Sequence, residues 1–316
     1  MYTTMEEILT YQTEFYSAYF DPDNVILESS AEYRFINYLC RKQVDKAMAL
    51  FEENQQFGGV RSAVDAPMGR FEGLNEIRDF AENWLNYAEA EDAWPSPVIQ
   101  TRAGGRSCTE FMINYKLRDY DKVLSVPMFV IGDLRAGGKL DELRIYFFFK
   151  WLPNIGPYRH RIFKPSFNKP IETPLLTGVM REYIDCLSHL DPDEEMRRMK
   201  NMFSEDVVYG GSRPSVFSKV IRGKEEVIEK YFTFIQPKAL EERGYVRFEA
   251  ITDDGVTCVC EWVGTYPSND LTKGLQQSGC ASYTRDKKTG LLKGIRIIDN
   301  ARFQDTIDWS TVKFRY

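Results

Sequence analysis

The sequence contains few of the residues from which metal and redox sites are built. It has two histidines, His160 and His189, and none of its six cysteines forms a Cys-x-x-Cys motif. A zinc site commonly needs four such ligands at short spacings, so the sequence predicts no bound metal. Phosphate-binding loops, nucleophile elbows and dinucleotide-binding glycine fingerprints are missing too. We therefore expect no cofactor.

Long apolar runs and concentrated positive charge are also missing. Without a run of about 18 apolar residues we expect no membrane span, and a net charge of −6 disfavours a nucleic-acid partner. The first residues lack the basic start and apolar stretch of a signal peptide, which predicts a cytoplasmic protein with reduced thiols. Aromatic residues, by contrast, make up 14% of the chain, which favours wide cores or an apolar cavity.

One segment of the chain occurs twice. Each copy contains a phenylalanine, five residues with two acids, an aromatic residue, Gly-Gly, one further residue and an arginine. The copies begin at Phe51 and Phe203, an offset of 152 residues (203 minus 51), and end at Arg61 and Arg213. The identical spacing indicates an internal duplication.

Further signatures recur in the same order, at offsets of 150 to 152 residues. They are Gly73 and Gly223 before a third helix, Glu110-Phe111 and Glu261-Trp262 in one expected strand, and Arg144 and Arg296 in the last expected strand. Each copy therefore reads as two helices, a turn, a third helix and about four strands. We interpret the recurring acids and arginines as charge pairs that a sheet packed on its twin would bury, with a catalytic carboxylate as the alternative.

The duplication divides the chain into four expected parts. Residues 1–29 form an N-terminal helical extension, 30–151 a first domain, 152–175 a linker and 176–316 a second domain. The linker contains five prolines from Pro153 to Pro174, which suits a semi-rigid connector and excludes a helix.

The order of these elements resembles the NTF2-like superfamily, and its SnoaL-like group most of all. The resemblance covers 30–150 and 176–305. It implies an α+β fold made of two cone-shaped domains, in each of which a curved antiparallel sheet wraps around helices and leaves a deep, mainly apolar pocket. It also implies sheet-to-sheet pairing, here as a pseudo-dimer within one chain, and leaves a homo-oligomer open. The implied partner is a small apolar or aromatic ligand.

The resemblance also marks positions for catalysis. The ketosteroid isomerase pattern places its carboxylate base at Gly59 and Gly211, which have no side chain. It places its oxyanion-binding tyrosine at Phe35 in the first copy and at Tyr183 in the second. Only the second copy keeps the phenol, and the alternative for both rings is packing in the core.

The second copy is therefore the expected catalytic one. His189 and Asp299, which have no equivalents in the first copy, join Tyr183 as candidate acid and base residues. His189 as a helix-end or surface residue is the alternative. The first copy, with Phe35 and Phe147, is expected to be filled or purely apolar.

The candidate ligand-binding residues come from both copies. Arg61 and Arg213 have a guanidinium that suits a carboxylate, phosphate or enolate, and pairing with a neighbouring acid or a place between the copies is the alternative. The other candidates are Asp65, Tyr115, Tyr209 and Trp262.

Two functions follow from these observations. The first is a cofactor-independent lyase or isomerase acting on an apolar, ring-bearing small molecule. The second is a non-catalytic binding or assembly module, which the missing base at Gly59 and Gly211 favours. The order of elements alone decides neither of them.

Overall fold

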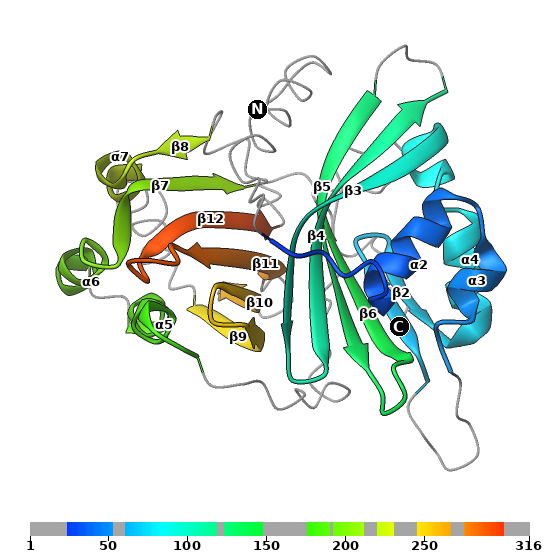
Figure 1. Ribbon diagram of the computed structural model, residues 1–316, viewed down its shortest axis with the longest axis horizontal. Coiled ribbons are helices and arrows are strands. Elements are labelled where there is room, and N and C mark those ends of the chain that lie inside the picture. The colour runs from blue at the N-terminus through cyan, green and yellow to red at the C-terminus, as the bar shows by residue number, and fades with distance from the viewer. Residues whose placement is uncertain are drawn as a thin grey trace.

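The computed structural model describes residues 24–52, 61–118, 123–147, 176–189, 192–211, 220–230, 245–266 and 275–299. These residues form two units, and each unit has helices and one six-stranded sheet (Figure 1). Residues 1–23 of the expected N-terminal extension, the linker at 152–175 and the first Gly-Gly pair lie outside the described residues.

The first unit consists of three α-helices, one 3₁₀ helix and six strands among the described residues. They are α2 (Ala31–Cys40), α3 (Val44–Met48), β1 (Ala63–Ala66), β2 (Gly69–Glu72), α4 (Gly73–Glu82), η1 (Asn86–Ala88), β3 (Ala90–Ala103), β4 (Arg106–Leu117), β5 (Val123–Leu134) and β6 (Leu140–Phe147).

The second unit repeats this order. Its described elements are α5 (Val179–His189), α6 (Pro192–Met199), β7 (Phe203–Gly211), β8 (Ile221–Arg222), α7 (Lys224–Lys230), β9 (Tyr245–Asp253), β10 (Thr257–Tyr266), β11 (Leu275–Arg285) and β12 (Leu292–Asp299). The strand orders, β2-β1-β6-β5-β4-β3 and β8-β7-β12-β11-β10-β9, are the same. The duplication predicted from the sequence is confirmed.

The sheets are mixed, because the first strand of each unit runs parallel to the last. β1 pairs with β6 and β7 pairs with β12 in parallel, and every other pairing in the two sheets is antiparallel. The expectation of about four strands was wrong by two, because the two strands before each third helix were not expected. The apolar pattern of 194–203 predicts a helix over that whole range, but α6 ends at Met199 and Phe203 already begins β7.

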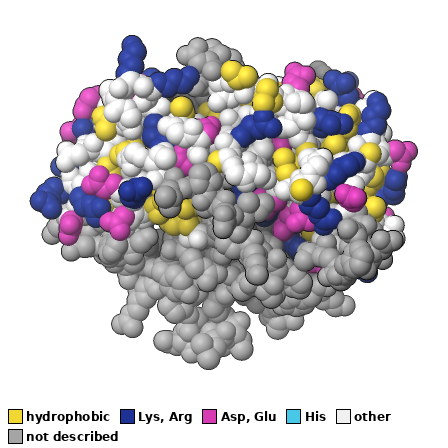
Figure 2. Space-filling view, turned by 60° about the horizontal axis from the view of Figure 1, so that its bottom comes forward, with side chains coloured by type: hydrophobic (Ala, Val, Ile, Leu, Met, Phe, Trp, Pro, Cys, Tyr) yellow, Lys and Arg dark blue, Asp and Glu magenta, His cyan; other side chains and the backbone are white. Residues whose placement is uncertain are grey.

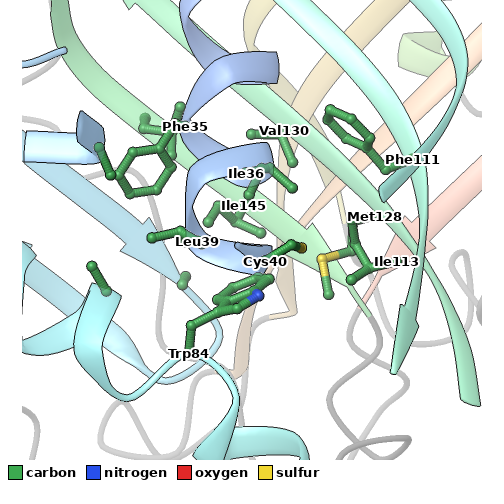
Figure 3. Packing of buried hydrophobic residues seen from close by; sticks show 14 of the residues in the cluster. Phe35, Ile36, Leu39, Cys40, Trp84, Phe111, Ile113, Met128, Val130 and Ile145 are labelled. Carbon is green, nitrogen blue, oxygen red and sulfur yellow. The ribbon is translucent and has the colours of Figure 1, made fainter. Parts of the chain in front are cut away.

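Helix α2 holds the first unit together. Its apolar positions Phe35, Ile36 and Leu39 recur at helical spacing, and each is at most 1% exposed. Figure 3 shows this stripe packed over the sheet residues Phe111, Met128, Val130 and Ile145. Each such buried side chain contributes roughly 2 kcal/mol by leaving water. The predicted α+β fold, with helices packed on a sheet, is confirmed for both units.

The two sheets face each other, and the helices lie on the outer sides (Figure 1). A small apolar cluster joins the sheets, made of Cys108, Phe129, Ile131, Tyr146, Ala250, Val259, Cys280 and Ile298. Two buried ion pairs flank it. Arg144 of β6 binds Glu261 of β10, and Arg296 of β12 binds Glu110 of β4. The recurring charges are therefore buried and paired, but not within one copy as expected: β4 and β6 are separated by β5, and each arginine binds the acid of the other unit.

Candidate functional site

Aromatic rings from three elements meet inside the second unit. Tyr183 of α5 is 2% exposed, and its ring centroid lies 5.1 Å from that of Tyr283 on β11 and 5.9 Å from that of Phe203 on β7. Tyr209 of β7 and Trp262 of β10 belong to the same buried cluster. Three of the sequence candidates, Tyr183, Tyr209 and Trp262, thus come together in one interior.

Trp262 is fitted to its neighbour across the sheet. It pairs with Gly279 of β11, and a Cβ atom built on that glycine would lie 2.6 Å from Trp262 Cε2 and 2.8 Å from the Ile298 carbonyl oxygen. No side chain has room there, so the glycine leaves the space that the indole occupies. Gly279 in turn pairs with Asp299 of β12. The backbone register therefore sets Trp262, Gly279 and Asp299 in one row across three strands.

The first unit repeats this interior without two of its phenols. Phe35 stands at the position of Tyr183, and its ring meets Phe51 edge to face at 5.4 Å, as Tyr183 meets Phe203. Gly132 stands at the position of Tyr283, because it pairs with Ser107 as Tyr283 pairs with Cys258. The phenols at these two positions therefore belong to the second unit alone.

Tyr115 lies at the other end of the first interior. Its ring centroid is 6.2 Å from that of Trp84, and the residue is 1% exposed. Burial raises the pKa of the Tyr115 phenol well above its ordinary value, and burial also raises the pKa of the nearby Cys40 thiol to about 12. Both groups are therefore neutral at physiological pH.

The first interior also contains a buried acid that the sequence did not reveal. Glu32, in the first turn of α2, is fully buried. Its Oε1 accepts hydrogen bonds from Ser107 Oγ (2.5 Å), Ser30 Oγ (2.8 Å), Thr109 Oγ1 (2.8 Å) and Gln100 Nε2 (3.2 Å). Of the two expectations for the first copy, a purely apolar interior was wrong at this end, because Gln100, Ser107 and Thr109 come from strands far along the chain. A filled interior stays a prediction.

Gln100 extends this polar cluster to the segment before α2. Its amide oxygen accepts a hydrogen bond from the Leu27 backbone N–H at 2.9 Å, and its own backbone N–H donates to Asn24 Oδ1 at 2.9 Å. Gln100 Nε2 also contacts Ser30 Oγ and Thr109 Oγ1. The cluster thus fastens the start of α2 to β3 and β4, which is a structural role.

The charged candidates of the first unit lie away from its interior. Arg61 is exposed just before β1. Asp65 of β1 is fully buried and paired with Arg70 of β2, whose guanidinium also contacts Glu142 at 2.9 Å. Asp65 alternates along β1 with the core residue Val64, so it faces the opposite side of the sheet.

Two candidates of the second unit are only partly placed. His189 is the last residue of α5 and Asp299 the last residue of β12, and their side chains lie outside the described residues. Arg213 lies outside them altogether. Among the described residues, no group of three or more His, Cys, Asp or Glu side chains is arranged to hold a metal ion.

The described surface has the mixed charge of a solvated protein. On the face shown in Figure 2, lysine and arginine side chains are interspersed with aspartate and glutamate. None of the described helices is both long enough and apolar enough to cross a lipid bilayer.

The sequence matches no protein-family model and no curated protein. Among solved structures, an NTF2-like protein of unknown function from Cytophaga hutchinsonii is 18% identical, with 40% of this chain and 93% of that chain covered and a TM-score of 0.28. A protein with a ketosteroid isomerase-like fold from Catenulispora acidiphila, solved with trimethylamine, is 13% identical, with coverages of 37% and 85% and a TM-score of 0.31.

A third solved structure, RV0760c from Mycobacterium tuberculosis in complex with estradiol-17beta-hemisuccinate, is 19% identical to this chain. The match covers 38% of this chain and 88% of that chain, with a TM-score of 0.28. Each of the three matches thus spans about the length of one unit. From its own strand order and helix positions, the chain consists of two units of the same α+β fold in tandem.

Proposed function

We propose that the interior of the second unit binds a small, apolar, ring-bearing molecule and acts on it as a cofactor-independent lyase or isomerase. The observation that carries this proposal is the buried cluster of Tyr183, Tyr209, Tyr283 and Trp262. Flat aromatic walls suit a flat apolar ligand. The phenols supply the polar groups that orient such a ligand, and Phe35 and Gly132 supply none at two of these positions in the first unit.

The chemistry requires one group that takes a proton and one that stabilises the oxygen on which charge develops. Tyr183 is the proposed donor to that oxygen, because a phenol buried among rings donates a hydrogen bond where water does not compete. Asp299, in the same strand row as Trp262, is the proposed base that removes a proton from the adjacent carbon. His189 and Arg213 complete the proposal as a proton carrier and an anion clamp.

Proton transfer to solvent provides the test. A panel of polycyclic ketones is screened for thermal stabilisation, and the hits are incubated in deuterated water while exchange next to the carbonyl is followed by mass spectrometry. We expect wild type to catalyse exchange and the Tyr183→Phe/Asp299→Asn double variant to lose at least about 100-fold of the rate. Tyr38→Phe, a tyrosine on the outer side of α2, is the matched control. Undiminished exchange in the double variant would refute the enzyme.

A non-catalytic binding or assembly module is the second candidate. It is favoured by Gly211, the last residue of β7, at the position where the resemblance puts the base. On this reading a ligand stabilises wild type and the double variant equally, and neither catalyses exchange. The two candidates are thus separated by exchange rather than by binding.

Pairing of the two units as an intrachain pseudo-dimer completes the proposal. It is supported by the reciprocal ion pairs Arg144–Glu261 and Arg296–Glu110, which use the sheet face through which a separate partner would pair. The expected result in light scattering is the mass of one chain, and a concentration-dependent dimer would contradict it. The SnoaL-like branch and the cytoplasmic location remain predictions from the sequence.

A further inference from the structure

Two thiols lie side by side in the second unit, at the end of the interior away from Asp299. Cys258 and Cys260 of β10 are both fully buried, and their sulfur atoms are 3.7 Å apart. Residues two apart on a strand share one face, and both cysteines belong to the cluster between the sheet and α5. The pair therefore points into the interior of the unit.

The first unit shows where side chains at these two positions meet. The equivalents of Cys258 and Cys260 are Ser107 and Thr109, each 151 residues earlier (258 minus 107 and 260 minus 109). Both hydroxyls donate to one atom, Glu32 Oε1, at 2.5 and 2.8 Å. The two strand positions thus converge on a common point beside the helix, where they bind a shared partner.

In the second unit a sulfur residue replaces that partner. Met180 stands in α5 where Glu32 stands in α2, 148 residues later, the same offset that relates Phe35 to Tyr183 (183 minus 35). Met180 is fully buried and belongs to the same cluster as both cysteines. A carboxylate with two hydroxyl donors in one unit has become a thioether with two thiols in the other.

The spacing of the thiols suits a shared metal ion. With metal–sulfur bonds of about 2.3 Å, two sulfurs on one ion in a trigonal or tetrahedral arrangement lie roughly 3.7 to 4.0 Å apart. A disulfide, in contrast, needs sulfurs about 2.05 Å apart and Cβ atoms closer than neighbouring positions on one strand face allow. Chelation therefore fits this pair better than oxidation does.

We propose that Cys258 and Cys260 bind one Cu(I) ion, with Met180 as the third donor. Thiolate and thioether sulfurs are soft ligands that suit Cu(I), whereas the zinc and iron–sulfur sites that also use thiolates commonly need four ligands. Binding converts Cu⁺ and two thiols into a Cu(I) dithiolate and releases two protons. The proposal goes beyond small-molecule binding and does not depend on it.

The test titrates the reduced full-length chain with Cu(I) against a chromophoric Cu(I) chelator, with far-ultraviolet circular dichroism as the check on folding. We expect one equivalent bound by wild type and by Cys40→Ala, which removes a buried thiol of the first unit. We expect no bound Cu(I) in Cys258→Ala/Cys260→Ala and at least 10-fold weaker binding in Met180→Leu. Failure of wild type to compete for Cu(I), or full binding by the cysteine double variant, would overturn the proposal.

A second measurement uses wild type alone, so that the proposal can still be tested if the Cys258→Ala/Cys260→Ala variant does not fold. The chain is partly unfolded in urea with and without one equivalent of Cu(I), alkylated, and digested for mass spectrometry. We expect Cu(I) to protect Cys258 and Cys260 by at least 10-fold while Cys40 and Cys108 react at unchanged rates. Equal protection of all four cysteines, or protection of none, would contradict the site. Ketone binding by the same samples shows separately whether the proposed function holds.

Discussion

Arg144 of the first unit and Glu261 of the second form a two-pronged ion pair. The guanidinium Nε lies 2.6 Å from Glu261 Oε1 and Nη2 lies 2.9 Å from Oε2, and Tyr146 donates to the same carboxylate at 2.8 Å. The equivalent pair, Arg296 with Glu110, has distances of 2.5 and 2.9 Å. Each unit thus gives one arginine and one acid to the other, so that neither sheet face is electrostatically complete alone.

Removing one partner of this exchange should destabilise the whole chain. In Arg144→Met the carboxylates of Glu261 and Asp133 remain buried without their shared guanidinium. We expect a loss of about 3–5 kcal/mol in the free energy of unfolding, measured by urea denaturation. Arg78→Met, which breaks the exposed pair with Asp45, is the control and should leave the midpoint in place. Equal midpoints for both variants would contradict the prediction.

Asp133 should contribute to stability above pH 4 and lose that contribution in acid. Burial alone would raise its pKa, but the guanidiniums of Arg144 and Arg106 outweigh burial and lower the pKa to about 2. A carboxyl with a folded-state pKa below its unfolded-state value stabilises the protein above the unfolded-state pKa, and the effect disappears as pH falls through about 2. Its size is about 2 kcal/mol.

Asp133→Asn provides the comparison. We expect the stability difference between wild type and the variant, measured by urea denaturation at pH 5, 4, 3 and 2, to shrink steadily toward the acid end. A difference independent of pH would show that Asp133 acts through shape rather than charge.

The polar cluster around Glu32 should stabilise the first unit. Glu32→Leu leaves the hydroxyls of Ser107 and Thr109 and the amide of Gln100 without their common acceptor. Because each buried unsatisfied group costs about 1–3 kcal/mol, we expect a loss of at least about 3 kcal/mol in unfolding free energy. Glu32→Gln, which keeps an acceptor, should lose less than half as much. The exposed Glu82→Leu change on α4 is the control.

Gly279 should tolerate no side chain while Trp262 is present. Gly279→Ala forces the new methyl group against the indole and the Ile298 carbonyl, and we expect a loss of about 1–3 kcal/mol. In the background of Trp262→Phe, a smaller ring, the same change should cost at least about 1 kcal/mol less. Additive effects in this double-mutant cycle, measured by urea denaturation, would disprove the contact.

The duplication and the order of helices could be read from the sequence, because glycines and aromatics keep their spacing when a domain is copied. The two strands before each third helix could not. β1, β2 and β8 have four residues or fewer, which carry too little alternation to separate them from a loop, and β7 begins at Phe203, where the apolar pattern of 194–203 favours a helix. The partners of Arg144 and Arg296 were also hidden. Their spacing shows that they recur, and only the packing of the two sheets shows that they exchange acids.

The interior was predictable in part. Tyr183 and Trp262 could be singled out because each occupies a repeated position. Glu32 could not, because an acid in the first turn of a helix is ordinary on the surface. Its burial depends on Gln100, Ser107 and Thr109, some 70 residues away. The inward polar residues of β3 and β4 were the one available signal, since alternating positions facing a helix are expected to be apolar.

The parallel pairing of β1 with β6 has a consequence for folding during synthesis. β1 emerges from the ribosome about 75 residues before β6, the strand with which it pairs. Its backbone N–H and C=O groups on that side therefore have no strand partner until the first unit is nearly complete. The ion pair of Arg144 with Glu261 forms later still, because Glu261 is synthesised more than 100 residues after Arg144. A chain stopped after the first unit would therefore expose a sheet face on which Arg144 lacks Glu261 and Glu110 lacks Arg296, and exposed surface of this kind makes incomplete chains prone to aggregate.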